Sequence, residues 1–178
     1  LITNLWQTST AKRLGFEACG DLRLGICNGE SAAETADIGL ERFIVSSEAR
    51  KSPAAVMPRG QIIYGALPVM TLEKCAIREI CGAKLPPISA CRYCDTHRFS
   101  YLCDRLGVKF PMAREYKHRN VIFNSVPVYM GDKKSGMDCE FYHYIFTNES
   151  CAEIDRIIGI TEKGKNYGGK FCRLSSPK

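Results

Sequence analysis

Four cysteines within twenty residues, Cys75, Cys81, Cys91 and Cys94, are the side chains of this sequence best suited to chemistry. In a reducing compartment, clustered thiols bind metal or react more often than they form disulfides. Four thiolates hold an iron–sulfur cluster, and the same donors hold a structural zinc ion. Zinc ribbons usually have two CxxC pairs and this chain has one. The spacing therefore favours an iron–sulfur cluster and leaves zinc, or thiols without a ligand, open.

A fifth thiol in this region, Cys103, either replaces one of the four ligands or lines the site. A catalytic CxxC redox pair normally opens a helix directly after a strand, whereas Cys91 follows the run PPISA, so this interpretation is disfavoured. The remaining thiols are expected to pack among apolar residues, as buried cysteines commonly do. They are Cys19, Cys27, Cys139, Cys151 and Cys172.

Positive charge is concentrated around the same cysteines. The net charge is +6, and residues 74–119 contain ten Lys or Arg against four Asp or Glu, while the rest of the chain balances at fifteen and fifteen. Such a segment attracts RNA or a small anionic substrate and offsets the charge of a thiolate-bound cluster. A solvated surface has the same composition. The cations are Lys74, Arg78, Lys84, Arg92, Arg98, Arg105, Lys109, Arg114, Lys117 and Arg119.

The composition is that of a globular protein, with 45% apolar and 25% charged residues among 178. No apolar run reaches the ~20 residues of a transmembrane helix, and the first residues lack the pattern of a signal peptide, so we expect a cytoplasmic chain without membrane contact. Neither GxSxG nor HExxH is present, and the spacing of the three histidines implies no triad or zinc protease. His97, His118 and His143 are each expected to have a surface or core role.

Helix and strand signals alternate at the start of the chain. Asn4 and Gln7 predict the start of a helix that Gly15 ends, and Ser31 with Glu34 predicts a second helix, which ends at Gly39. Strands are predicted at residues 16–22, 42–47, 61–64, 121–123 and 141–146, and Ser150 with Glu153 predicts a last helix.

The two glycine stops lie 24 residues apart, which suits βα units of a parallel sheet. Residues 68–118 interrupt this pattern with prolines and the cysteines, and they are predicted to be loop and short helix more than sheet. The expected organisation is βα units over 1–67, a basic cysteine-rich insertion over 68–118, and closing strands with a helix over 119–178.

Polar side chains follow successive predicted strands, where barrel enzymes place their chemistry. Asp21, Glu48 and Tyr64 are the candidate substrate-binding residues, and no catalytic residue is assigned. A complete eight-unit barrel needs ~250 residues, and about four strands here have βα character. The sequence starts at Leu1 and enters a helix at once, so we expect an N-terminal half-barrel to be missing or supplied elsewhere.

Several separated motifs resemble the collagenase-like peptidase family, peptidase family U thirty-two. They are YGALPVM (64–70), Cys75, CDRLGVKFPM (103–112) and RNVIFNSVPVYMGDK (119–133), preceded by TNLWQTSTAKRLGF, CGDLRLGICN and ERFIVSSEA. They occur in the order of the family and span nearly the whole chain. Two positions depart from its familiar signature, which has Cys in place of Pro68 and Glu in place of Gly60.

The resemblance implies the C-terminal portion of a TIM-like (β/α) barrel, an α/β fold whose insertion binds a [4Fe-4S] cluster. It places the ligands at Cys75, Cys81, Cys91 and Cys94, with Cys103 where the family branch usually has Thr. It also implies oxygen-independent hydroxylation of RNA or a related small substrate, with prephenate as the implied oxygen donor of some members. The alternatives are the peptidase or collagenase of the family's name and a zinc-stabilised RNA-binding module without catalysis.

Overall fold

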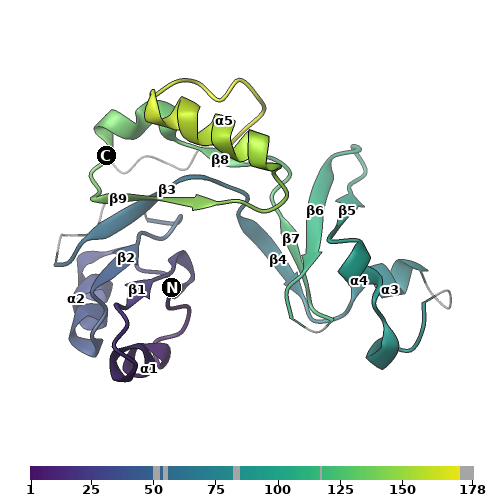
Figure 1. Cartoon of the computed structure of the whole chain (residues 1–178), viewed down its shortest axis with the longest axis horizontal. Coiled ribbons are helices and arrows are strands. Elements are labelled where there is room, and N and C mark those ends of the chain that lie inside the picture. The colour runs from purple at the N-terminus through teal and green to yellow at the C-terminus, as the bar shows by residue number, and fades with distance from the viewer. Residues whose placement is uncertain (50–52, 54–55, 82–84, 117, 173–178) are drawn as a thin grey trace.

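The chain folds into two lobes, each built around one β-sheet (Figure 1). The computed structural model describes residues 1–49, 53, 56–81, 85–116 and 118–172, except for the side chain of Cys81. Within these described residues, nine strands form the two sheets, five in sheet A and four in sheet B.

Sheet A is a mainly parallel sheet built from both ends of the chain. Strand β3 is at its centre: it pairs with β2 and β9 in parallel and with β8 in an antiparallel direction, while β1 pairs with β2. The strands are β1 (Cys19–Gly20), β2 (Arg42–Ile44), β3 (Arg59–Gly65), β8 (Val128–Tyr129) and β9 (Phe141–Ile145).

The helices around sheet A begin and end at recognisable caps. Helix α2 starts with a capping box between Asn28 and Ser31 and ends at Gly39, whose φ of 105° is left-handed. Helix α5 starts with the predicted capping box of Ser150 and Glu153. The helical segments are α1 (Gln7–Arg13), η1 (Leu22–Leu24), α2 (Gly29–Ile38), η4 (Gly131–Gly136) and α5 (Cys151–Glu162).

Sheet B is antiparallel, with the order β4-β7-β6-β5, and lies in the chain between β3 and β8. Two short helices, α3 and α4, lie beyond it on the side away from β1 and β2 (Figure 1). Its elements are β4 (Pro68–Leu72), α3 (Ala76–Cys81), η3 (Ile88–Ala90), α4 (Tyr93–Thr96), β5 (Phe99–Cys103), β6 (Lys109–Arg114) and β7 (Asn120–Phe123).

The prediction of a partial TIM-like barrel is wrong. The observed fold is mixed α/β with two sheets, and sheet A remains open without barrel closure. The repeat of helix and strand does not continue, because the chain forms the whole of sheet B between β3 and the parallel strand β9. Gly15 and Gly39, which lie 24 residues apart, therefore mark the ends of two individual helices and not a barrel repeat.

Residues 68–118 contain the short helices α3, η3 and α4 and several loops, and they also form the three strands β4, β5 and β6 of sheet B, which the sequence did not predict. Two of the prolines in this range, Pro68 and Pro111, lie within strands at positions where a strand tolerates proline. Pro68 is the first residue of the edge strand β4. Pro111 pairs with Tyr101 of β5, and the pairing of β6 with β7 begins only at Met112.

Candidate functional site

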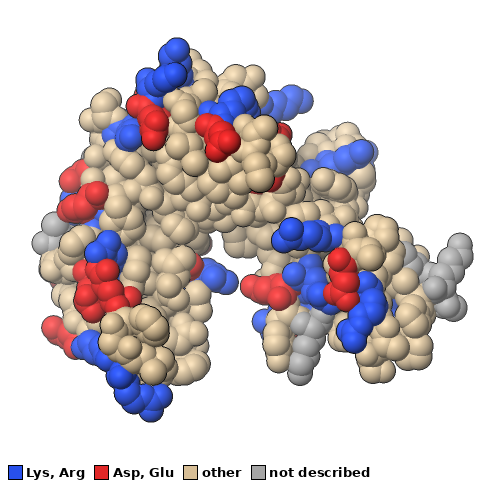
Figure 2. Space-filling view, in the orientation of Figure 1, with Lys and Arg blue, Asp and Glu red and all other residues tan. Residues whose placement is uncertain are grey.

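A cleft of about 460 Å³ lies between the two sheets, and the hollow between the lobes is visible in Figure 2. Its volume is in the range of small-molecule sites. Sheet B supplies one wall, and sheet A with the first residues supplies the other. The lining residues are Leu1, Asp21, Leu22, Arg23, Pro68, Ala113, Arg114, Glu115, Val121, Phe123, His143, Tyr144, Ile145 and Phe146.

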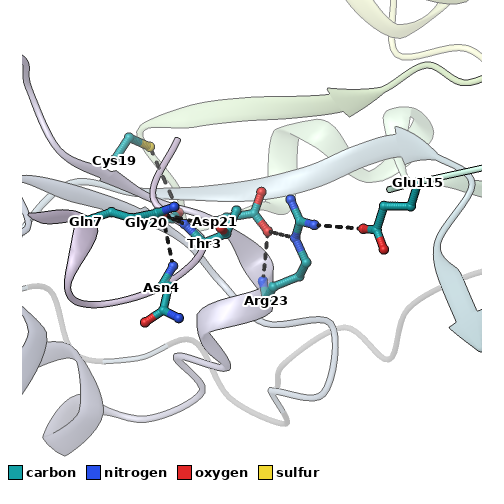
Figure 3. A network of polar contacts seen from close by, with 8 residues as sticks. All are labelled: Thr3, Asn4, Gln7, Cys19, Gly20, Asp21, Arg23 and Glu115. Carbon is teal, nitrogen blue, oxygen red and sulfur yellow. Dashed lines mark hydrogen bonds and ion pairs between the residues drawn. The ribbon is translucent and has the colours of Figure 1, made fainter. Parts of the chain in front are cut away.

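Asp21 is held in the cleft by backbone pairing and by Arg23 (Figure 3). Its amide donates to the carbonyl of Ile2 at 2.8 Å, which fixes the end of β1. One carboxylate oxygen, Oδ1, accepts from the amide and the Nε of Arg23, at 3.0 and 2.9 Å. The guanidinium of Arg23 also reaches Glu115 beyond the end of β6, 3.6 Å away, and so connects the two walls. Of the predicted substrate-binding residues, Asp21 is the one that lines the cleft.

His143 on β9 lines the same cleft. Burial lowers the pKa of its imidazole below the ordinary 6.5, and the nearby Asp21 carboxylate opposes that shift. The ring is therefore neutral at pH 7 and can accept a proton. Sequence reasoning gave His143 no functional role, and its only signal was a polar side chain inside an aromatic strand, FYHYIF.

The sheet A wall ends in stacked aromatic rings. Tyr144 and Phe146 lie with their centroids 5.7 Å apart and their planes 18° from parallel. The buried ring of Tyr64 contacts Phe146 at 5.5 Å, and its hydroxyl donates to Glu149 at 2.7 Å. The structure places Tyr64 behind the wall and does not bring it to the cleft surface. Glu48 is exposed and is not part of the cleft lining.

The thiols of Cys75, Cys91 and Cys94 lie near one another beside α3 and α4. All three are half-buried, and Cys75 and Cys94 pack against the buried cluster formed by Ile77, Met112 and Ile122. Burial raises the pKa of the Cys94 thiol, Cys75 and then Cys91 raise it further, and Arg114 opposes the rise. Several thiolates this close repel one another, and a bound cation or cluster relieves that repulsion.

The fourth predicted ligand lies outside what the structure describes. Cys81 is the last residue of α3, and its side chain is not described. Among the described residues, no group of three or more His, Cys, Asp or Glu is close enough to hold a metal ion. The three described thiols therefore share a region without forming a closed metal site by themselves. Cys103 is exposed at the far end of β5.

Asn120 provides a test of whether this region suits a sulfur cluster. Its side chain is fully buried on β7, and its Oδ1 accepts from the amide of Ala76, the residue after Cys75, at 2.8 Å. Its Nδ2 is a buried donor with no acceptor among the described residues. A buried unpaired donor is costly, and the sulfur atoms of a cluster or its thiolates are acceptors for it. This amide would therefore suit a sulfur acceptor next to Cys75, although the described thiols do not form a metal site by themselves.

Arg114 connects the cleft to the part of the chain around Cys75, Cys91 and Cys94, here called the cysteine region. Its side chain reaches Asp95 of α4 at 2.7 Å and affects the pKa of Cys94, and the residue also lines the cleft. A second hollow of about 180 Å³ lies between the two and is lined by Cys94, Arg98, Phe99, Ala113 and Arg114. Ala113 and Arg114 are common to both cavities, so a group held by Cys94 would lie beside whatever occupies the cleft.

The basic segment, residues 74–119, has a surface of both positive and negative charges, and some of its cations form ion pairs. Figure 2 shows Lys and Arg interspersed with acidic side chains on the lobe of sheet B. Arg92 and Arg114 reach Asp95, and Arg119 reaches Glu73. Lys84 and Lys117 lie outside the described residues.

Comparison of the chain with protein-family models, with curated proteins and with solved structures finds no match. Within the described part of the chain, every helix is too short or too polar to cross a membrane.

Proposed function

We propose that this chain is an iron–sulfur enzyme that hydroxylates RNA without using molecular oxygen. The observation that carries the proposal is the wall common to the cleft and the cysteine region, formed by Ala113 and Arg114. A substrate in the cleft would be separated from a cluster at Cys94 by little more than these two residues. This proximity is what electron transfer between a cluster and a substrate requires.

Cys75, Cys81, Cys91 and Cys94 would hold the cluster, which supplies one-electron chemistry when bound. Asn120 would donate a hydrogen bond to one of the sulfur atoms. Arg114 would offset part of the negative charge of the thiolates, as it does for Cys94. A cluster with such neighbours is easier to reduce than one without them, because both interactions favour the more negative state.

The proposed substrate is a base of RNA. Enzymes that modify a base extrude it from the stack into a pocket and hold it against aromatic or apolar side chains. The cleft has the volume for one base, and Phe123, Tyr144 and Phe146 give it aromatic walls. The cations of sheet B would hold the phosphate backbone near the opening.

The reaction replaces a ring C–H bond by C–OH, which oxidises the base by two electrons. An organic hydroxyl compound would donate the oxygen and be reduced by the same two electrons, so that RNA–H and R′–OH give RNA–OH and R′–H. Asp21 and Arg23 would orient polar groups of the two substrates in the cleft. The neutral His143 would accept the ring proton and return it to the donor product.

Metal analysis of anaerobically purified protein tests the cluster. The unchanged chain should be brown and contain iron and acid-labile sulfide. Cys75→Ser and Cys94→Ser should lose both, while Cys27→Ser, an exposed thiol beyond the cysteine region, should retain them. A colourless protein with one zinc ion per chain would instead support the zinc-stabilised RNA-binding alternative.

Mass analysis of nucleosides tests the reaction. RNA from cells that produce the protein should contain a nucleoside heavier by one oxygen atom, which disappears with Cys94→Ser and with His143→Gln. Gelatin cleavage that survives replacement of all four cysteines would contradict this proposal and favour the peptidase of the resembled family.

A further inference from the structure

The two faces of sheet B differ in what covers them. Paired residues of neighbouring strands point to the same face, so the register assigns each side chain to a face. One face carries Met112 and Ile122, which are buried beneath α3 and the cysteine region. The other face, here called the cleft face, carries Phe99, Tyr101, Pro111, Ala113, Val121 and Phe123.

The cleft face continues from the cleft out to the edge strand β5. Ala113, Val121 and Phe123 line the cleft, and the pairs Phe99 with Ala113 and Tyr101 with Pro111 extend the same face across β6. Cys94 of α4 borders the Phe99 end of this extension in the second hollow, whereas Tyr101 further out is 52% exposed. Aromatic rings therefore stand at both ends of the cleft face, Phe123 in the cleft and Phe99 with Tyr101 on β5, with Ala113 and Pro111 of β6 between them.

Three cations lie at the ends of β5 and β6 and in the turn between them, next to the rings of β5. Lys109 is opposite Cys103 on the cleft face, Arg98 lies directly before Phe99, and Arg105 lies in the turn between β5 and β6. None of the three forms an ion pair with another residue of the described chain, unlike Arg114 and Arg119. Residues 97–109 contain these three cations against the single acid Asp104. The charge at the edge of the cleft face is thus suited to an anionic chain.

We propose that the cleft face of sheet B binds single-stranded RNA and leads it into the cleft, an inference that rests on the proposed function. Flat aromatic side chains on an open sheet stack on unpaired bases, and cations at the edge bind the phosphates. Duplex RNA conceals its base faces in the stack and presents none to Tyr101. The nucleotide modified in the cleft would therefore belong to a loop or an unpaired strand, whose neighbours lie along β6 and β5.

Fluorescence anisotropy with a labelled single-stranded oligonucleotide of mixed sequence tests this surface. Tyr101→Ala should weaken binding by about tenfold, the loss expected for one stacked base. Leu102→Ala is the matched control, because Leu102 is the next residue of the same strand, is 40% exposed and points to the opposite face. It should leave the affinity unchanged. The same sequence as a duplex should bind weakly and should not distinguish Tyr101→Ala from the unchanged chain.

The salt dependence of binding tests the cations separately. Lys109→Gln should lower the slope of log affinity against log salt concentration by about 0.7, the value for one phosphate contact on a single strand. Lys163→Gln, at the end of α5 on the other lobe, should leave the slope unchanged. Equal slopes for both variants, together with equal affinity for Tyr101→Ala, would overturn the proposal.

These outcomes separate this inference from the proposed function. RNA binding that depends on Tyr101 in a protein without iron would support the surface and contradict the iron–sulfur enzyme. A brown protein that modifies RNA, but binds it equally well after Tyr101→Ala and Lys109→Gln, would retain the enzyme and overturn the surface.

Discussion

In sheet A, six of the seven residues of β3 are buried, whereas in sheet B four of the five residues of β4 are exposed. Sheet A is supported by two hydrophobic clusters, and sheet B by a cluster with three buried members, Ile77, Met112 and Ile122. Each buried apolar side chain stabilises the fold by about 1.5–3 kcal/mol, which must offset about 1–2 kcal/mol of backbone entropy for every ordered residue. Burial alone supports sheet B far less well than sheet A.

This difference gives the cysteine region a second role. Small units with little core commonly depend on a metal or cluster, whose binding energy becomes folding energy. Cys75 and Cys94 pack against the small hydrophobic cluster of sheet B. Bonds from these thiols to a metal would therefore connect α3 and α4 to the sheet. We therefore expect the proposed cluster to stabilise sheet B as well as to react.

The largest effect should follow loss of the proposed cluster. Cys94→Ser, or treatment of the unchanged protein with a chelator, should remove hydrogen-exchange protection from the amides of β5 and β6, because sheet B loses its main support. The amides of β3 should keep their protection. Equal protection of β5 and β6 before and after both of these treatments would show that sheet B is as self-sufficient as sheet A.

The next largest effect should come from the core of sheet A. Phe43 is fully buried on β2, and Phe43→Ala should lower the free energy of unfolding by about 3–5 kcal/mol through the cavity it leaves. Phe16→Ala, which changes a ring that is 66% exposed, is the matched control and should change it by less than about 0.5 kcal/mol. Urea unfolding followed by circular dichroism measures both. A small loss for Phe43→Ala would remove the contrast between the two sheets.

The two sheets also differed in how well the sequence predicted them. Strands occur where β-branched and aromatic runs predicted them at residues 42–47, 61–64 and 141–146, although β2 ends at Ile44. The capping box of Ser150 and Glu153 was confirmed. The second box was placed three residues late, since Asn28 and not Ser31 is the cap of α2. Of the strand predicted at 16–22, β1 retains Cys19–Gly20.

In sheet B the strand predicted at 121–123 is confirmed as β7, which is mostly buried. Strands β4, β5 and β6 were not predicted, because they are largely exposed or half-exposed and two of them contain proline. The same limit applies to the site. Asp21 could be predicted as a polar residue after a strand, whereas the contribution of Arg114 and Glu115 depends on the packing of sheet B against sheet A. No sequence pattern encodes that approach, nor the burial that gives His143 its lowered pKa.

Asn120 should contribute less to the free energy of unfolding than a core side chain such as Phe43, but more than a surface ion pair. Asn120→Ala leaves the amide of Ala76 without its acceptor and should lower stability by about 1–3 kcal/mol. Asn120→Asp keeps an acceptor and adds negative charge beside the thiols, so it should shift the reduction potential of the proposed cluster to a more negative value. Spectroelectrochemical titration measures this shift. An unchanged potential in both variants would show that the buried Nδ2 does not contact the cluster.

A smaller effect should appear as pH falls. His143 has a lower pKa in the folded chain than the 6.5 of the unfolded one, so below pH 6.5 the unfolded chain binds the proton more readily and stability decreases. Above pH 6.5 the group contributes nothing, because it is neutral in both states. His143→Gln should remove this part of the pH dependence, and the exposed His97→Gln should leave it intact. Urea midpoints measured above and below pH 6.5 test the direction of this change in stability. A midpoint that rises on acidification in the unchanged chain, but not in His143→Gln, would contradict the prediction.

The smallest effect should come from the ion pair that joins the two sheets. Arg23 and Glu115 are 3.6 Å apart with side chains 53% and 40% exposed, and such pairs contribute between zero and about 1 kcal/mol. Arg23 also keeps its bond to Asp21 when Glu115 is changed, so Glu115→Gln should have little effect on unfolding in either low or high salt. A double-mutant cycle of Arg23→Gln with Glu115→Gln measures the coupling. A coupling energy well above 1 kcal/mol would mean that the sheets stabilise each other across the cleft, and sheet B would then owe its order to sheet A and not to the cysteine region.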